Sequence, residues 1–168
     1  GVPVTVVVPQ STTVRAKELI GAEAADIVVH GASWQEANTL ARSMVAAHDA
    51  FLHPFDDPLL WQGHATLIDE ARRQGSKPGA IVLSVGGGGL LCGVVEGLAR
   101  NDWPDVPVIA VETAGADSYA RALHANRLVE LPAIASIATS LGARQVCQQA
   151  FDLARRHPIR SVVVSDLH

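Results

Sequence analysis

Cysteine is scarce in this sequence: Cys92 and Cys147 are the only two among 168 residues. Two cysteines are too few for a disulfide framework or a cysteine-based zinc site, and they are typical of a reducing compartment. None of the seven histidines has a partner at a metal-ligand spacing, which argues further against zinc. We therefore expect a cytoplasmic protein.

Clusters of basic residues are absent as well. The formal net charge is −4 at pH 7, and the only adjacent basic residues are the pairs Arg72-Arg73 and Arg155-Arg156. This distribution argues against nucleic acid or an anionic membrane surface as a partner. No apolar run approaches the roughly 20 residues of a transmembrane helix. We expect no nucleic-acid partner and no membrane partner.

What the chain does contain is apolar sequence. Hydrophobic residues make up 48% of the chain and charged residues only 18%. That balance is typical of a globular protein with extensive burial rather than of a disordered chain. A length of 168 residues suits one domain or two small ones.

Four consecutive glycines, Gly86 to Gly89, join an apolar run over residues 80–85 to a helical pattern that reaches Arg100. Consecutive glycines can adopt positive φ and point several backbone N–H groups at one spot. The helix that follows adds its unpaired N-terminal N–H groups and the positive end of its dipole. The stretch therefore predicts a phosphate-binding loop.

Two familiar nucleotide-binding loops fit this stretch less well. A P-loop needs Lys and then Ser or Thr after its last glycine, whereas Gly93 is followed by two valines. In a dinucleotide-binding fingerprint the third glycine would fall on Leu91 or Cys92. Glu112, placed like a ribose-binding acid, keeps a dinucleotide site as a minor alternative. A purely structural turn is disfavoured by the backbone entropy of four glycines.

The hydrophobic pattern alternates between strands and helices. We expect strands at residues 4–8, 26–30, 80–85, 106–111, 128–131 and 161–164. We expect helices at residues 14–23, 34–47, 59–74, 90–100, 118–125, 134–140 and 143–157. Such alternation predicts an α/β fold with a mostly parallel sheet flanked by helices, in which ligands bind beyond the carboxyl ends of the strands. The prolines at 54 and 58 mark a crossing between two subregions, with a boundary near Asp49.

Four motifs together resemble one enzyme family, and they occur in a consistent order between Gly1 and Asp166. They are Pro54-Phe55-Asp56-Asp57-Pro58, Trp61-x-Gly63-His64, the run from Ser84 through Gly86-Gly87-Gly88-Gly89-Leu90 to Val95, and Val111-Glu112-Thr113-x-Gly115-Ala116. The family is L-serine/L-threonine dehydratase, in the fold-type II group of pyridoxal-phosphate enzymes, whose fold is similar to the tryptophan synthase β subunit. The resemblance implies that residues 1–49 are the later part of a small domain and residues 50–168 part of a large, phosphate-binding domain.

The resemblance also implies two sets of site residues. Those expected to bind pyridoxal phosphate are Gly86, Gly87, Gly88, Gly89, Leu90, Ser140, Leu141 and Phe55, although Phe55 also suits core packing. Those expected to bind a monovalent cation beside the cofactor are Gly86, Glu112, Ala116, Ser118, Leu141 and Ala143. Backbone carbonyls, one carboxylate and one hydroxyl form a cage of hard oxygen ligands, which suits potassium.

The activity implied by the resemblance is β-elimination of water from L-serine or L-threonine, giving a 2-oxo acid and ammonia, by an enzyme that is commonly a homodimer. In the family a Schiff-base lysine follows a Ser-Phe motif, and this chain does not contain that motif. Its two lysines, Lys17 and Lys77, suit a solvated helix face and the amino end of a strand. We expect this span alone to be inactive, with no catalytic residue of its own.

Alternatives to the dehydratase remain. A serine racemase has the same cofactor group, and a non-catalytic module that binds a phosphate ligand needs no lysine. Cys92 could be a nucleophile near a helix N-terminus, but a small core residue is the better interpretation of its apolar neighbours. Trp103, in an Asn-Asp-Trp-Pro loop, is expected to be exposed.

Overall fold

The computed structural model describes residues 1–167 and divides into two compact units, the first formed by Gly1–Leu52 and the second beginning at His53. The first unit contains β1 (Thr5–Val8), α1 (Val14–Ala22), β2 (Asp26–Val29) and α2 (Trp34–Met44). The two strands pair in parallel, from Thr5 beside Asp26 to Val8 beside Val29. The assignment of residues 1–49 to a small domain stays a prediction.

Both helices of the first unit begin where side chains cap them. The hydroxyl of Thr13 accepts a hydrogen bond from the backbone N–H of Ala16 at 3.2 Å. Ser33 accepts from the N–H of Glu36, whose carboxylate in turn accepts from the Ser33 hydroxyl at 3.1 Å. The other carboxylate oxygen of Glu36 accepts from the backbone N–H of Ala32 at 3.1 Å rather than from that of Ser33. Only the Ser33 half of a capping box is therefore formed, and it is enough to start α2 at Trp34.

The second unit is a parallel three-stranded sheet with helices. Its elements are α3 (Pro58–Gln74), β3 (Ile81–Ser84), α4 (Gly89–Arg100), β4 (Val108–Thr113), α5 (Ser118–Ala125), the 3-10 helix η1 (Thr139–Leu141), α6 (Gln148–Leu153) and β5 (Ile159–Val164). The strand order is β3-β4-β5, with Ser84 beside Val111 and Thr113 beside Val164. The carboxyl ends of all three strands therefore lie at one edge. The predicted α/β class with parallel sheets is confirmed.

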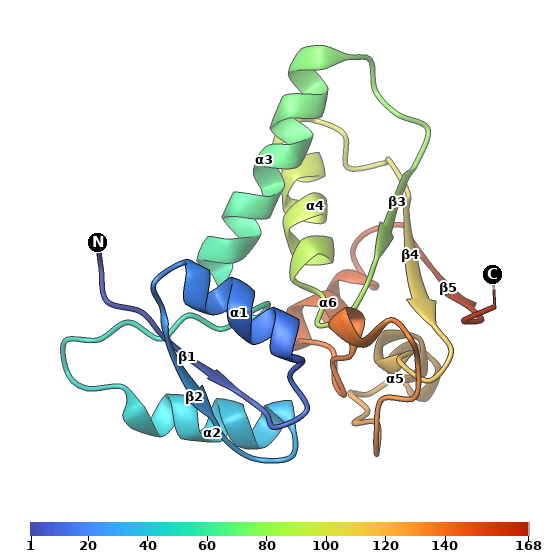
Figure 1. The fold of residues 1–168 in the computed structure, drawn as a ribbon. Coiled ribbons are helices and arrows are strands. Elements are labelled where there is room, and N and C mark those ends of the chain that lie inside the picture. Colours follow the sequence, from blue (N-terminus) through green and yellow to red (C-terminus); the bar gives the residue numbers. More distant parts are fainter. Residues whose placement is uncertain (168) are drawn as a thin grey trace. The chain divides into compact units, whose positions relative to one another are not determined.

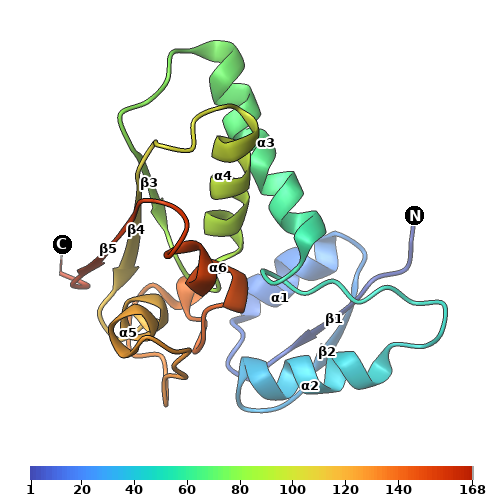
Figure 2. The same cartoon turned by 180° about the vertical axis from the view of Figure 1, so that it is seen from behind.

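Helix α4 runs between α3 and the sheet (Figures 1 and 2). It is buried along most of its length, from Gly89 to Leu98, because both sides are covered. Gly97 allows α3 to come close, since a Cβ atom there would lie 2.7 Å from the carbonyl oxygen of Ala65. The helix that follows the glycine loop is thus held in the centre of the unit's hydrophobic core.

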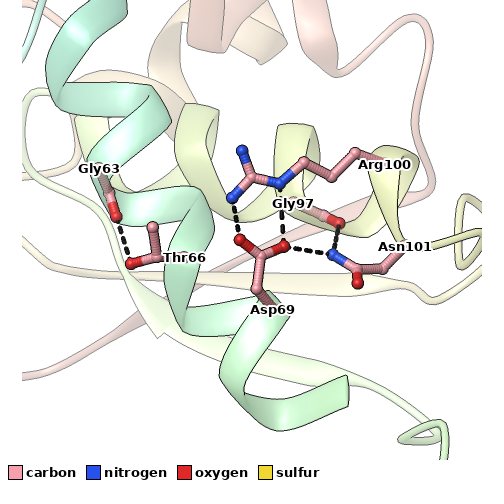
Figure 3. A network of polar contacts seen from close by, with 6 residues as sticks. All are labelled: Gly63, Thr66, Asp69, Gly97, Arg100 and Asn101. Atoms are coloured by element: carbon pink, nitrogen blue, oxygen red, sulfur yellow. Dashed lines mark hydrogen bonds and ion pairs between the residues drawn. The ribbon is translucent and has the colours of Figure 1, made fainter. Parts of the chain in front are cut away.

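A polar network fastens the other end of α4 to α3 (Figure 3). Arg100 forms two hydrogen bonds with the carboxylate of Asp69, and the side-chain amide of Asn101 donates to the same carboxylate at 2.7 Å. The hydrogen bond with Arg100, followed by that with Asn101, holds the pKa of Asp69 below its usual range. The pair is partly exposed, so we attribute to it the alignment of the helices rather than a large share of stability.

The region between α5 and β5 differs from expectation. Residues 128–131 form no strand, because only Leu131 pairs, through its N–H, with the carbonyl of Arg144 at 2.7 Å. Residues 134–140 are helical only at η1. The backbone N–H of residue 137 donates to the Asp166 carboxylate and that of residue 138 to the Ser136 hydroxyl, and these bonds replace helical ones. The helix expected at 143–157 is only α6, because Cys147 is extended and donates its N–H to Gly87 at 2.9 Å.

Trp103 is a further correction. It is 4% exposed and belongs to the hydrophobic core, although its loop suggested exposure. The guanidinium of Arg72, from α3, lies 5.3 Å from the centre of the indole ring. A long amphipathic side chain therefore covers the ring on one face, which the local sequence does not reveal.

No helix within residues 1–167 is both long enough and apolar enough to cross a membrane.

Candidate functional site

The glycine loop lies at the carboxyl end of β3 and leads directly into α4. Gly88 is the N-cap of this helix and has φ of +95°, a left-handed conformation that glycine adopts without strain. Within residues 1–167, none of the six backbone N–H groups from Gly86 to Leu91 donates to another group of the chain. Unpaired N–H groups in a half-buried loop cost free energy. A bound phosphate would accept hydrogen bonds from these six groups and remove that cost.

The missing side chains of the loop serve the protein's own packing. A Cβ atom at Gly87 would lie 2.1 Å from Cγ of Phe55, and one at Gly88 would lie 2.6 Å from the Cβ of Ala150. At Gly86 it would lie 2.8 Å from the carbonyl oxygen of Leu141. The glycines thus allow close approach by the protein, and the amides are left to meet a ligand.

Two residues expected at the cofactor site, Phe55 and Leu141, are therefore brought against the glycine loop. The indole N–H of Trp61 donates to the carbonyl of Phe55 at 2.8 Å and fixes its backbone. Leu141 is in η1, and Leu90 is half-buried in the first turn of α4. Ser140 is exposed in η1 with no contact to the loop among the described hydrogen bonds. Their roles toward a cofactor stay predictions.

A chain of hydrogen bonds ties the segment before η1 to the sheet. The hydroxyls of Thr113 and Ser136 lie 2.7 Å apart, and Ser136 donates to the carboxylate of Asp166 at 2.8 Å. Thr113 ends β4 and Asp166 follows β5, so the segment is anchored at the carboxyl edge of both strands. This anchoring is consistent with the position of Leu141 beside Gly86.

Glu112 is buried at 1% exposure near the end of β4. Its two carboxylate oxygens accept hydrogen bonds from the N–H groups of Tyr119 at 2.8 Å and Ala120 at 2.7 Å. The carboxylate thus caps α5, whereas the side chain of Asp117, the residue at the N-cap position, makes no capping hydrogen bond. Burial raises the pKa of Glu112 to about 7, against the opposing effect of the two hydrogen bonds.

The capping role of Glu112 overturns the dinucleotide alternative. A ribose-binding acid must be within reach of a sugar, but Glu112 is 1% exposed and its carboxylate faces the first turn of α5 inside the protein. The spacing of the loop glycines also misses the fingerprint. Glu112 is therefore not placed to hold a ribose.

The expected cation ligands form two groups. Leu141 contacts Gly86 through its carbonyl, which also accepts from the N–H of Ala143 at 2.9 Å. On α5, Ser118 is fully buried, and its hydroxyl has no hydrogen-bond partner within the described chain. An orphaned buried hydroxyl beside the α5 segment that Glu112 caps suits a cation that supplies the missing contact.

The cation cage itself stays a prediction. Ala116 is buried in the turn before α5, and no described contact joins it to Ala143 or Leu141. Within residues 1–167, no group of three or more His, Cys, Asp and Glu side chains is arranged to hold a metal ion.

The two cysteines lie together beneath the glycine loop. Their sulfur atoms are 3.8 Å apart, and both residues are buried in the core. The hydrogen bond with Cys147, followed by burial, raises the pKa of the Cys92 thiol. The interpretation of Cys92 as a core residue is therefore confirmed, because a nucleophile needs a lowered pKa and access.

Lys77 is far from the glycine loop along β3. It precedes the amino end of the strand, whereas the loop follows the carboxyl end, and its ammonium pairs with Asp105 in the connection before β4. Four strand residues at about 3.3 Å each separate the two ends. Lys77 is thus excluded as a cofactor-binding lysine, and Lys17 is half-buried in α1 of the first unit.

Sequence reasoning missed His53, which lies just before the Pro-Phe-Asp-Asp-Pro motif. Its ring nitrogen Nδ1 accepts hydrogen bonds from the N–H groups of Phe55 at 3.3 Å and Asp56 at 2.8 Å. A histidine two residues before a glycine-loop contact carries no recognisable signal by itself. The bend over residues 54–56 brings its ring back to the chain.

Comparison with known proteins points to one family. The sequence matches the protein family described as "Pyridoxal-phosphate dependent enzyme" over residues 1–168. It is 48% identical to "L-serine dehydratase/L-threonine deaminase" of Homo sapiens, over 99% of this chain and 52% of that protein. The chain spans about half the length of the curated relatives it matches.

Solved structures that are similar to this chain point to the same family. An L-serine ammonia-lyase from the fungus Rhizomucor miehei superposes with a TM-score of 0.89 and 38% identity, over 99% of this chain and 53% of that one. Maize serine racemase superposes with a TM-score of 0.88 and 25% identity, over 99% and 50%. The resemblance inferred from the motifs is confirmed. The chain belongs to the family of pyridoxal-phosphate dependent enzymes.

Proposed function

We propose that the protein containing this chain is a pyridoxal-phosphate-dependent ammonia-lyase that converts L-serine and L-threonine to 2-oxo acids and ammonia. The observation that carries the proposal is the cluster of six unpaired amide groups from Gly86 to Leu91 in a chain 48% identical to a serine dehydratase. The unpaired amides support phosphate binding at this loop, and the names of the relatives support the reaction.

The phosphate of the cofactor would be held by the glycine loop. The amides of Gly86 to Gly89 and Leu90 supply hydrogen bonds, and the N-terminus of α4 adds a favourable dipole of about 0.3–1 kcal/mol or more when partly buried. When bound, pyridoxal phosphate withdraws electrons from the amino-acid substrate. Phe55 packs against the loop on one side. We assign Ser140 and Leu141 to one face of the cofactor ring.

A monovalent cation, for which potassium is our choice, completes the proposed site. The orphaned hydroxyl of Ser118, the carboxylate of Glu112 and the carbonyls of Gly86, Ala116, Leu141 and Ala143 are the proposed ligands. All six offer oxygen, the ligand that hard cations prefer. Its role would be to fix η1 and the glycine loop relative to α5.

The covalent lysine of the reaction is not assigned within residues 1–167, because Lys77 is paired with Asp105 at the opposite edge of the sheet. We therefore expect the isolated span to bind phosphate without turnover. The proposal further places the protein in the cytoplasm and makes it a homodimer. Analytical ultracentrifugation of the full-length protein tests the dimer.

The deciding experiment measures 2-oxo acid formation from L-serine, L-threonine and D-serine by the full-length protein with pyridoxal phosphate. We expect activity on both L-amino acids that requires the cofactor. Interconversion of D- and L-serine without a 2-oxo acid would instead identify a serine racemase, the alternative kept open by the maize structure.

A matched pair of glycine variants tests the loop. Gly88→Ala would force a Cβ atom to within 2.6 Å of Ala150 at φ of +95°, whereas Gly79 has no atom within 4 Å of an added Cβ. We expect Gly88→Ala to weaken cofactor binding at least roughly tenfold and Gly79→Ala to leave it unchanged. Equal binding by both variants would contradict the proposed cradle.

A further inference from the structure

His53 is a buried imidazole, 7% exposed, that lies at the start of the segment leading into α3. Its Nδ1 atom is 2.8 Å from the backbone nitrogen of Asp56 and 3.3 Å from that of Phe55. Because both nitrogens carry protons, Nδ1 must provide the lone pair for both hydrogen bonds. The ring is therefore neutral with its proton on Nε2.

The same ring also contacts the side chain of Phe55. The two ring centres are 4.5 Å apart and the planes are perpendicular, which is a favourable edge-to-face geometry. His53 thus holds Phe55 at its backbone N–H and at its ring. Trp61, whose indole N–H donates to the Phe55 carbonyl, holds the remaining backbone group.

Phe55 in turn lies directly on the glycine loop. A Cβ atom at Gly87 would be 2.1–2.3 Å from three atoms of the Phe55 ring, and one at Gly89 would be 2.7 Å from the Phe55 carbonyl oxygen. Contacts this close leave no gap between Phe55 and the loop. A shift of Phe55 must therefore be accompanied by a change in the loop.

We infer that His53 is a positioning residue for phosphate binding: it fixes Phe55, and Phe55 fixes the glycine loop in the conformation that turns its amides toward one anion. His53 touches neither the loop nor the ligand in this inference. The inference rests on the phosphate-binding role proposed above for Gly86 to Leu91.

Two substitutions separate the acceptor from the bulk of the ring. In His53→Asn the side-chain oxygen takes nearly the place of Nδ1 and can accept from residues two and three positions ahead, as in Asx turns. His53→Phe keeps an aromatic ring and its buried volume but removes the acceptor. A role limited to filling space predicts the opposite order of damage.

The test measures binding of pyridoxal phosphate, inorganic phosphate and pyridoxal to the full-length protein by calorimetry. We expect His53→Phe to weaken both phosphate-bearing ligands roughly tenfold, with little effect on pyridoxal, since about two hydrogen bonds are lost. His53→Asn should stay within about twofold of the wild type. Phosphate binding unchanged in His53→Phe, or weakened equally in both variants, would overturn the inference.

A measurement on the wild-type protein keeps the inference testable even where a variant fails to fold. Nitrogen-15 NMR of the His53 ring should show Nδ1 unprotonated, with scalar coupling to the amide of Asp56. A protonated Nδ1 would overturn the assignment of its acceptor role. If the wild-type protein binds neither inorganic phosphate nor pyridoxal phosphate, the proposed function itself fails, which is a different result from equal binding by wild type and variants.

Discussion

At the scale of single residues, two opposing effects act on the pKa of the buried carboxylate of Glu112. Its oxygens cap α5 through Tyr119 and Ala120, which favours the charged form, while burial favours the neutral form and raises the pKa to about 7. The carboxyl group is therefore poised near neutrality. A nearby cation would favour the charged form, which links cation binding to the proton held at Glu112.

This pKa predicts the pH dependence of stability. Because the folded-state pKa lies above the usual 4.5, the folded protein holds more protons than the unfolded one between these values. The free energy of unfolding should then fall as pH rises from about 5 to 8, by up to about 3 kcal/mol. Urea unfolding of the 168-residue chain at both pH values, without potassium, is the measurement.

Glu112→Gln is the control for that prediction, because it removes the titrating group and leaves other groups in place. His157, whose pKa is lowered by burial, destabilises the folded state in the opposite direction, as pH falls. The difference between wild type and Glu112→Gln isolates Glu112. A variant with the wild-type pH profile would contradict the assignment. Potassium at pH 8 should stabilise the wild type and not the variant.

The buried cysteines give a second prediction at this scale. Cys92 and Cys147 are 3% and 5% exposed, and the hydrogen bond between them and burial keep the Cys92 thiol protonated. Neither should react with a thiol reagent in the folded protein, and both should react after unfolding in urea. Mass spectrometry of the peptides that contain them is the measurement. Rapid labelling of either residue in native buffer would show that the loop opens.

At the scale of elements, the close approach of α3 and α4 depends on two glycines of α4, Gly93 and Gly97, and Gly97 gives the test. A Cβ atom at Gly97 would lie 2.7 Å from the carbonyl of Ala65 and 2.8 Å from the Cβ of Ile68. We expect Gly97→Ala to lower the free energy of unfolding by about 1–3 kcal/mol, because the helices must separate. Chemical denaturation measures this change.

Gly63 provides the matched control, because it is exposed on α3 and an added Cβ atom meets nothing within 4 Å. Gly63→Ala should raise the free energy of unfolding by about 0.5–1 kcal/mol, since alanine loses less backbone entropy in a helix. Equal effects at both positions would mean that helix propensity, rather than helix packing, determines the response.

Elements also divide according to how far the sequence could predict them. Where local signals start an element, its expected start was right to within one residue: α1, α2 and α3 begin after the side-chain caps Thr13, Ser33 and Asp57. Where distant backbone bonds decide, the prediction failed. The backbone N–H of Cys147 donates to the carbonyl of Gly87, and that of Leu131 to the carbonyl of Arg144. Neither hydrogen bond can be predicted from the local hydrophobic pattern.

The same distinction applies to the candidate site. The glycine loop could be found from the sequence alone, because four successive glycines before a helix leave bare amides that favour an anion. The position of Phe55 against it came only from the family resemblance, and His53 from neither. Residues that act by holding another residue are difficult to find in one sequence, since their effect depends on a turn formed in three dimensions.

At the scale of the whole molecule, the two units differ in how much apolar surface they bury. In Gly1–Leu52 only Val8 and Ala37 are buried hydrophobic residues, and α1 has no buried residue at all. The unit that begins at His53 contains the core around α4, with Leu91, Val94 and Leu98 nearly inaccessible. Since burial of apolar surface is the main source of stability, the units should differ in the free energy needed to open them.

We therefore expect hydrogen exchange in the 168-residue chain to be faster in β1 and β2 than in β4 and α4 by at least roughly a hundredfold, which corresponds to about 3 kcal/mol. Mass spectrometry of exchanged peptides is the measurement, with α5, which Glu112 caps, as an internal reference. Exchange at one rate throughout would mean that the two units open together. Phosphate added to the chain should slow exchange in the amides of Gly86 to Leu91 and leave β1 and β2 unaffected, because only the second unit carries the loop.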